Sequence, residues 1–352
     1  MNKHIFYIAA ACVALASCVK NEVRVDAPDQ EITFQTVSTK AGGTPFDTDH
    51  KFYSYAYFLE KGKKWEGDNL LTDAKPYINN ALISHQNGPS GHFWAATDIY
   101  YWPKQGSLTF FAWTDDTAAP SDGTVTNEKV TCAQDTGIKI TGYSVKDNRN
   151  KDILVAEIAK EETFATCGEN GVPTVFRHAL AKVEFNVNKK IDDTKVKFRV
   201  TSITLNNVST KGTFTQGSPS ESWGWSGQTE PGKLPVFTST TGVEVTEIAG
   251  PAPAKFDGLK PNADEGDYFI VLPQDFNNDT PTLTIEYEII TNYTGTEVKE
   301  TVTETKALKD IYKSNWECKK NYILGITLGL NEIYWVPSVE PWVDSAVTTD
   351  IH

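Results

Sequence analysis

The histidines and paired acids of this chain are the first side chains to test for chemistry. The stretch VFRHALAKVEFNV, residues 175–187, sets His178 against alternating apolar residues. His85 and His92 flank a short loop, but no carboxylate or third ligand stands at a spacing that completes a metal site. The adjacent acids at 115–116 would point to opposite faces of a strand. We therefore predict no metal site and no cofactor.

Short catalytic signatures do not occur either. The sequence has no G-x-S-x-G elbow, no Gly-rich phosphate loop and no H-E-x-x-H helix. The segment DNRNKD, residues 147–152, offers oxygen ligands but lacks the Gly and final Glu of an EF-hand loop. The sequence predicts a protein that is not an enzyme, with His178 in a structural position at the start of a strand.

Two tryptophans are the candidate ligand contacts. Trp223 and Trp225 lie in the polar segment SPSESWGWSGQTEPGKLP, residues 218–235, with one Gly between them. Exposed indole rings can stack on sugar faces or fill a pocket on a partner protein. The alternative is that one or both rings fold back to cover a core. The sequence leaves both interpretations open.

The N-terminus has the form of an export signal. Lys3 precedes the apolar run IFYIAAACVALA, residues 5–16, which is too short to span a bilayer comfortably. The following Ser17-Cys18 completes a segment that resembles the lipobox of bacterial lipoproteins. The resemblance implies a signal peptide over residues 1–17 and a lipid anchor on Cys18. An ordinary signal peptide with a chance Cys is the alternative.

The remaining cysteines make a disulfide framework impossible. Of five Cys, Cys12 leaves with the signal and Cys18 takes lipid. Cys132, Cys167 and Cys318 can form one bridge at most, and none of them makes a C-x-x-C motif. The core must therefore hold without disulfides, and whether one bridge forms is open.

Composition indicates a globular protein that can bury a sizeable core. The 352 residues favour two domains, and 39% of the residues are hydrophobic. The formal net charge is −13, which would repel a phosphate backbone and excludes nucleic acid as a partner.

Strand patterns recur along the whole chain. Runs such as FYSYAYFLE, SLTFFAW, TLTIEYEIIT and NYILGITLGLNEIYWVP are rich in aromatic or β-branched residues and bounded by turn residues. EITFQTV, residues 31–37, is a first strand set apart from the rest by a soft loop. We predict an all-β protein with a tether over 18–30, an N-terminal β-sandwich over 31–165 and a C-terminal β-sandwich over 172–345. The polar segment 160–173 is the expected junction.

Three landmarks resemble the fimbrillin family of lipoprotein pilus subunits and their anchor or tip proteins. They are VFRHALAKVEFNV at 175–187, VTSITLNNVSTKGTF at 200–214, and the ending that runs from WECKKNYILGITLGLNEI to VEPWVD. The resemblance, with the lipobox, spans nearly the whole chain. It implies two transthyretin-like β-sandwiches, in agreement with the strand patterns.

The resemblance also implies a mode of assembly. In fimbrillin stalk subunits a trypsin-like protease cuts after a basic residue in the loop that follows the first strand, that strand leaves, and a strand from a neighbour fills the groove. Lys40 stands in the matching loop here, where the stalk subunits usually have Arg. Cleavage after Lys40 and an unprocessed surface loop both stay open.

The predicted function is that of a fimbrillin-like pilus subunit serving adhesion, as stalk, anchor or tip. Its partners would be other fimbrial subunits, a protein or glycan ligand on a host or bacterial surface, and the outer membrane through the lipid on Cys18. The alternative is an outer-membrane surface lipoprotein that binds glycans for an uptake system.

Overall fold

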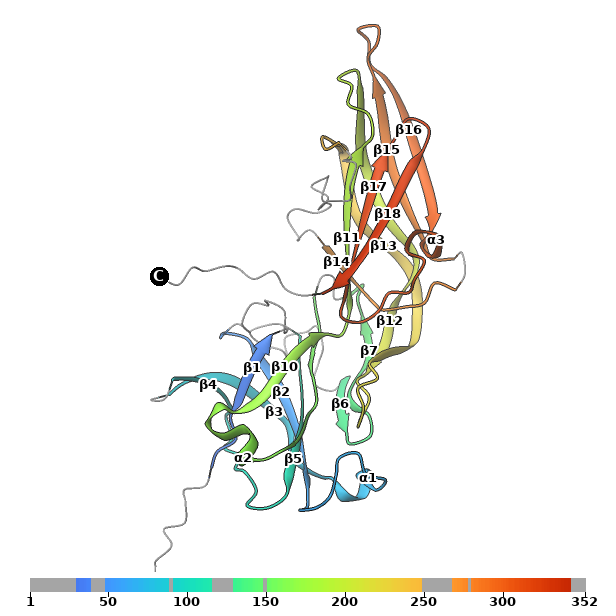
Figure 1. Cartoon of the computed structure of the whole chain (residues 1–352). Helices are drawn as coiled ribbons and strands as arrows, with labels where there is room; N and C mark the ends of the chain where they lie inside the picture. Colours follow the sequence, from blue (N-terminus) through green and yellow to red (C-terminus); the bar gives the residue numbers. More distant parts are fainter. Residues whose placement is uncertain are drawn as a thin grey trace, which may run out of the picture.

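The computed structural model describes residues 30–38, 48–88, 91–115, 129–147, 151–248, 268–277 and 280–342. Strands dominate these residues, so the predicted all-β class is confirmed. Figure 1 shows one group of strands around β1–β5 and β10 and, farther along the chain, a second group around β11–β18. No helix in the described part of the chain is long and apolar enough to cross a membrane.

The first group forms one sheet that closes on itself. Its strand order is β2-β3-β4-β1-β10-β8-β5-β9, and β2 also pairs with β5. Seven strands therefore make a closed circuit, called the ring below, and β9 branches from β5. The bounds are β1 Phe34–Ser38, β2 Lys51–Leu59, β3 Lys75–Gly88, β4 Gly91–Ala96, β5 Ser107–Thr114, β8 Leu154–Ala156, β9 Ala159–Glu162 and β10 Val172–His178, with helices α1 Leu70–Asp73, α2 Phe164–Cys167 and η2 Gly168–Asn170.

Aromatic side chains fill the core enclosed by this ring of seven strands. Phe52 is fully buried and lies 5.8 Å from the ring of Trp94 and 5.3 Å from that of Phe176, measured between centroids. Each side chain of this size contributes on the order of 2 kcal/mol by leaving water. The alternating pattern read from the strands thus builds a compact aromatic centre.

The second group has two sheets. One has the order β14-β11-β17-β18 and the other β16-β15-β12-β7-β6, while β13 pairs with β12. Val183, Phe185 and Val187 are buried as their alternation predicts. The bounds are β6 Val130–Ala133, β7 Gly137–Ser144, β11 Ala181–Lys189, β12 Val196–Thr215, β13 Gly224–Glu244, β14 Tyr268–Val271, β15 Thr282–Thr291, β16 Val298–Ala307, α3 Leu308–Tyr312, β17 Lys320–Leu328 and β18 Ile333–Pro341.

Strand pairing does not follow the expected junction at 160–173. β9 overlaps the start of that segment and pairs with β5, and β10, which begins at its end, pairs with β1 and β8. Conversely, β7 pairs with β12 in the second group. The division into 31–165 and 172–345 stays a prediction, while the chain passes from the first sheet to the second at Ala179–Leu180, between β10 and β11.

Candidate functional site

The first strand closes the ring. β1 runs parallel to β10 over five residue pairs but meets β4 at one pair, Phe34 with Trp94. Ile32 and Phe34 are 4% and 3% exposed, and the ring of Phe34 lies edge-on to Phe52 and Phe110 at 5.7 and 5.8 Å. The segment is therefore bound mainly by its inward apolar side chains and by one long edge.

A glycine lets β1 approach its neighbour. Gly171 has φ 82° and ψ 172°, a conformation that side chains beyond glycine rarely adopt. A Cβ there would lie 2.9 Å from the carbonyl carbon of Phe34. The next residue, Val172, donates its N–H to the Thr33 oxygen at 2.8 Å. The position of β1 thus depends on the absence of a side chain at 171.

The chain just before β1 is fixed by backbone hydrogen bonds. Ile32 N–H donates to Tyr100 O at 2.8 Å, and Trp102 N–H donates to Gln30 O at 2.9 Å. The predicted processing residue Lys40 and the predicted lipidation residue Cys18 lie outside the described residues. Cleavage and lipidation therefore stay predictions.

The two tryptophans are half-buried. The rings of Trp223 and Trp225 pack against Phe214 at centroid distances of 5.3 and 5.7 Å. Trp225 also donates its indole N–H to Ala179 O at 2.7 Å, at the point where β10 gives way to β11. Both rings cover the core, and their remaining surface faces a hollow described below.

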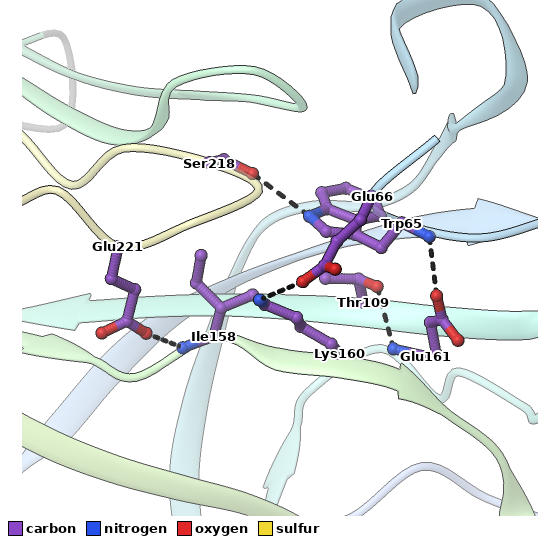
Figure 2. Close-up of polar contacts among 8 residues, drawn as sticks. All are labelled: Trp65, Glu66, Thr109, Ile158, Lys160, Glu161, Ser218 and Glu221. Carbon is purple, nitrogen blue, oxygen red and sulfur yellow. Dashed lines mark hydrogen bonds and ion pairs between the residues drawn. The ribbon is translucent and has the colours of Figure 1, made fainter. Parts of the chain in front are cut away.

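The loop before these tryptophans clamps the two strand groups together. Figure 2 shows Trp65 donating its indole N–H to Ser218 Oγ at 3.2 Å, and Ile158 N–H donating to a carboxylate oxygen of Glu221 at 2.6 Å. Behind the loop, Gln216 is fully buried. It accepts from Ile138 N–H at 3.1 Å and donates to Ala156 O at 2.8 Å. The polar segment at 218–235 thus makes structural contacts before it continues as β13 from Gly224.

Glu161 anchors the other side of this clamp. Its carboxylate accepts from Trp65 N–H at 2.7 Å, while its own N–H donates to Thr109 Oγ1 at 3.0 Å (Figure 2). The carboxylate also accepts from Lys64 Nζ at 2.9 Å. Partial burial acts to raise the pKa of Glu161, but the hydrogen bonds from Trp65 and Lys64 outweigh it and the pKa is lowered. The ionised carboxylate is the form that fits this site.

A hollow of about 420 Å³ opens beside the two tryptophans. The segment at the start of β13, the one after β14 and the one before β17 form its walls. The residues that matter below are Trp223, Trp225, Gln228, Asp275, Trp316 and Glu317. Lys319 holds its ammonium group 3.7 Å above the centroid of the Trp223 ring. Aromatic surface and carboxylates therefore meet in a single concavity, and the Lys319 ammonium covers one face of an aromatic ring that lines it.

His178 serves as a structural contact at the end of β10. It is 3% exposed, its Nδ1 contacts the carboxylate of Asp152, and its ring stacks on Trp342 at a centroid distance of 3.7 Å. Asp152 also accepts from Ile153 N–H at 2.7 Å. The contact joins the end of β18 to the ring, so this histidine has a fixed packing role.

The three cysteines in the described residues are free thiols. Burial, together with the carboxylate of Glu162, which accepts a hydrogen bond from Sγ at 3.3 Å, raises the pKa of Cys167 to about 12. Burial likewise raises the pKa of Cys318 to about 12 and that of Cys132 even higher. Thiols with raised pKa values are poor nucleophiles at neutral pH.

The sequence did not reveal the residues whose roles depend on pairing between strands that are far apart in the chain. Gln216 lies in a polar stretch, and its burial follows from the pairing of β12 with β7. Gly171 was assigned to a junction, and its close approach to Phe34 requires β1 to lie beside β10. A glycine in the sequence indicates a special backbone position, but it does not indicate that β1 lies against it.

Comparison with known proteins identifies the family. The fimbrillin-like family model matches residues 34–342, and no curated protein matches the chain. A fimbrial protein from Bacteroides vulgatus shares the fold with a TM-score of 0.56 at 15% identity, covering 89% of this chain and 100% of that one. The tip fimbrial protein Mfa3 from Porphyromonas gingivalis, solved with a C-terminal truncation, reaches a TM-score of 0.36 at 11% identity over 90% of this chain and 100% of that one. That score is too low to support an argument about position in a filament. Because the family model matches well over half of the residues, the chain belongs to the fimbrillin-like family.

Proposed function

We propose that this chain is a subunit of a cell-surface fimbrium that assembles by strand exchange and serves adhesion. The proposal rests on the position of β1 in the ring, between β4 and β10. β1 and the residues just before it present Ile32 and Phe34 to the core and expose Glu31 and Gln35 on the other side. An extended segment of another subunit with the same alternation could occupy the same seat.

Removing β1 would create the conditions for strand addition. The edges of β4 and β10 would lose their shared neighbour, and apolar side chains such as Phe52 and Phe110 would lose the cover of Phe34. Unpaired strand edges and exposed aromatic surface both favour the arrival of a new strand. The proposal assigns no reaction to the chain and no cofactor.

Cleavage after Lys40 is the step that would release β1. Intact-mass measurement of the protein from producing cells should find, in a polymerised fraction, chains that begin after Lys40. Finding only uncleaved mature chains in filaments would favour an anchor or tip role. Finding no filaments by electron microscopy with an antibody to this chain would overturn the fimbrial proposal.

Lipid attachment at Cys18 would hold the subunit at the outer membrane. We expect Cys18→Ala, or treatment with globomycin, to abolish lipid labelling and membrane fractionation. Ser17→Ala keeps a small residue before the cysteine and serves as the control. Lipid labelling that persists in Cys18→Ala would remove the anchor from the proposal.

Glycan binding for an uptake system is a second candidate function. The hollow beside Trp223 and Trp225 favours it, because aromatic surface and free carboxylates occur together there. Its test is a binding measurement, which does not depend on filaments.

A further inference from the structure

The hollow beside β13 has the dimensions of a ligand site. Its volume of about 420 Å³ lies within the range of roughly 300–1,000 Å³ for small-molecule sites. Trp223 and Trp225 are half-buried and line it, whereas Trp316 is 2% exposed and gives it a floor. An aromatic face that keeps part of its surface open can pack against the C–H face of a sugar ring.

Two carboxylates on the rim have no partner in the described part of the chain. Asp275 and Glu317 are both exposed and line the hollow, and neither carboxylate makes a hydrogen bond or ion pair there. Across the hollow, Gln228 donates its amide to Pro273 O, which leaves its own oxygen as an acceptor. The rim is therefore rich in acceptors, the groups that sugar hydroxyls donate to.

The charges around the hollow select against ionic ligands. Lys319 already holds its ammonium over Trp223, so an arriving cation would meet a like charge above that ring. An anion would be repelled by Asp275 and Glu317. A neutral hydroxyl avoids both penalties, because it can donate to a carboxylate and accept from an ammonium group.

The walls of the hollow are held in place by buried hydrogen bonds. Gln274 accepts from Ser209 N–H at 2.8 Å and donates to Leu272 O at 3.1 Å. Trp225 is fixed by its bond to Ala179 O. Walls that are ordered before the ligand arrives reduce the entropy cost of binding.

We infer that this hollow binds a neutral oligosaccharide, with the open part of the Trp225 ring against the sugar face, Trp223 beside it under the Lys319 ammonium, and Asp275 and Glu317 accepting from the sugar hydroxyls. The inference rests on the proposed adhesive or glycan-binding function and is independent of strand exchange.

The test is a titration of the purified full chain. The probes are maltotriose, mannotriose, N-acetyllactosamine, sialylated N-acetyllactosamine and an Arg-Lys peptide, followed by calorimetry and by saturation-transfer NMR. We expect saturable binding of at least one of the three neutral sugars. Asp275→Asn with Glu317→Gln should weaken it by about tenfold or more, since two charge-assisted hydrogen bonds are lost.

The control removes the same charge elsewhere. Asp192→Asn with Glu297→Gln changes two exposed acids away from the hollow and should leave sugar binding unchanged. The inference is overturned if no neutral sugar binds, if both double variants bind alike, or if the sialylated sugar or the basic peptide is preferred. Electron microscopy separates this result from the fimbrial proposal, because the Asp275/Glu317 variant should still form filaments if strand exchange operates.

Discussion

The ring and the second group of strands differ in how the edges of their sheets are protected. In the ring, each of the seven strands has a neighbour on both sides, and β1 supplies the link between β4 and β10. In the second group, β16 and β18 each end a sheet. The ring thus hides its edges by closure, and it depends on one short segment to do so.

Two of the edge strands in the second group, β16 and β18, carry protective side chains instead. Glu300 and Glu304 on β16 stand opposite the buried Ile289 and Ile285, so both lie on the core-side face of the sheet, at its exposed edge. β18 contains Pro337, which has no N–H to offer an incoming strand. Inward charges and prolines on edge strands are devices that discourage strand addition. Strand exchange is expected at the ring, where removal of β1 uncovers the edges of β4 and β10 together; of these, β10 contains one proline, Pro173, opposite Gln35.

The largest expected difference between the regions concerns a core side chain on β1. Phe34→Ala should lower the free energy of unfolding by about 3–5 kcal/mol, because it empties an aromatic site in the ring. Val298→Ala on β16, where the side chain is 62% exposed, should change it by no more than about 0.5 kcal/mol. Urea unfolding of both variants measures the contrast. Equal effects would mean that β1 contributes no more than an exposed edge.

The second contrast compares two glycines with positive φ. Gly171→Ala should cost about 3 kcal/mol, because the new Cβ adds a clash with the Phe34 backbone to the strain of the backbone conformation. Gly295→Ala, in the turn between β15 and β16, has φ 87° but open space around it, and should cost about 1 kcal/mol. The same unfolding experiment applies. Equal losses of unfolding free energy in the two variants would mean that the close approach of β1 does not restrict the side chain at residue 171.

The third contrast is in pH dependence. The pKa values of Glu161 and Glu332 are both lowered in the folded chain, so each contributes stability above about pH 4.5 that is lost as the pH falls through the folded value. Hydrogen bonds from Tyr334 and Lys190 lower the pKa of Glu332. Glu161 has a side chain 26% exposed against 57% for Glu332, so it is less screened. The free energy of unfolding, measured from pH 7 to pH 3, should depend less on pH in Glu161→Gln than in Glu332→Gln. The reverse order would contradict the role of Glu161 in the contact between the two strand groups.

The smallest effect on stability is expected at β16, where the readout is association. Glu300→Val with Glu304→Val should leave the free energy of unfolding nearly unchanged but cause self-association through the edge of β16. Light scattering against concentration detects it. Thr301→Val with Thr303→Val, on the outer face of the same strand, is the control. A monomeric Glu300/Glu304 variant would show that inward charge is not what protects this edge.

Local patterns were enough to predict the strands that alternate clearly, but not β13, which begins inside the polar segment at 218–235, nor β3. Alternation in ALAKVEFNV and TLTIEYEIIT corresponds to β11 and β15, because a half-buried strand must alternate its side chains whatever its partners are. The candidate sites were only partly predictable. Trp223 and Trp225 were found by residue type, but the docking of their loop on Trp65 and Ile158 depends on residues about 150 and 60 positions away.

The sequence by itself determined the all-β class and the family, since both follow from residue types at short spacing and from landmarks along the chain. Only the tertiary structure decided that β1 lies parallel to β10, roughly 140 residues later, and that His178 meets Asp152 and Trp342. The reason is that strand pairing joins backbone groups, which are the same in every residue, so the choice of partner is made by packing across the whole core.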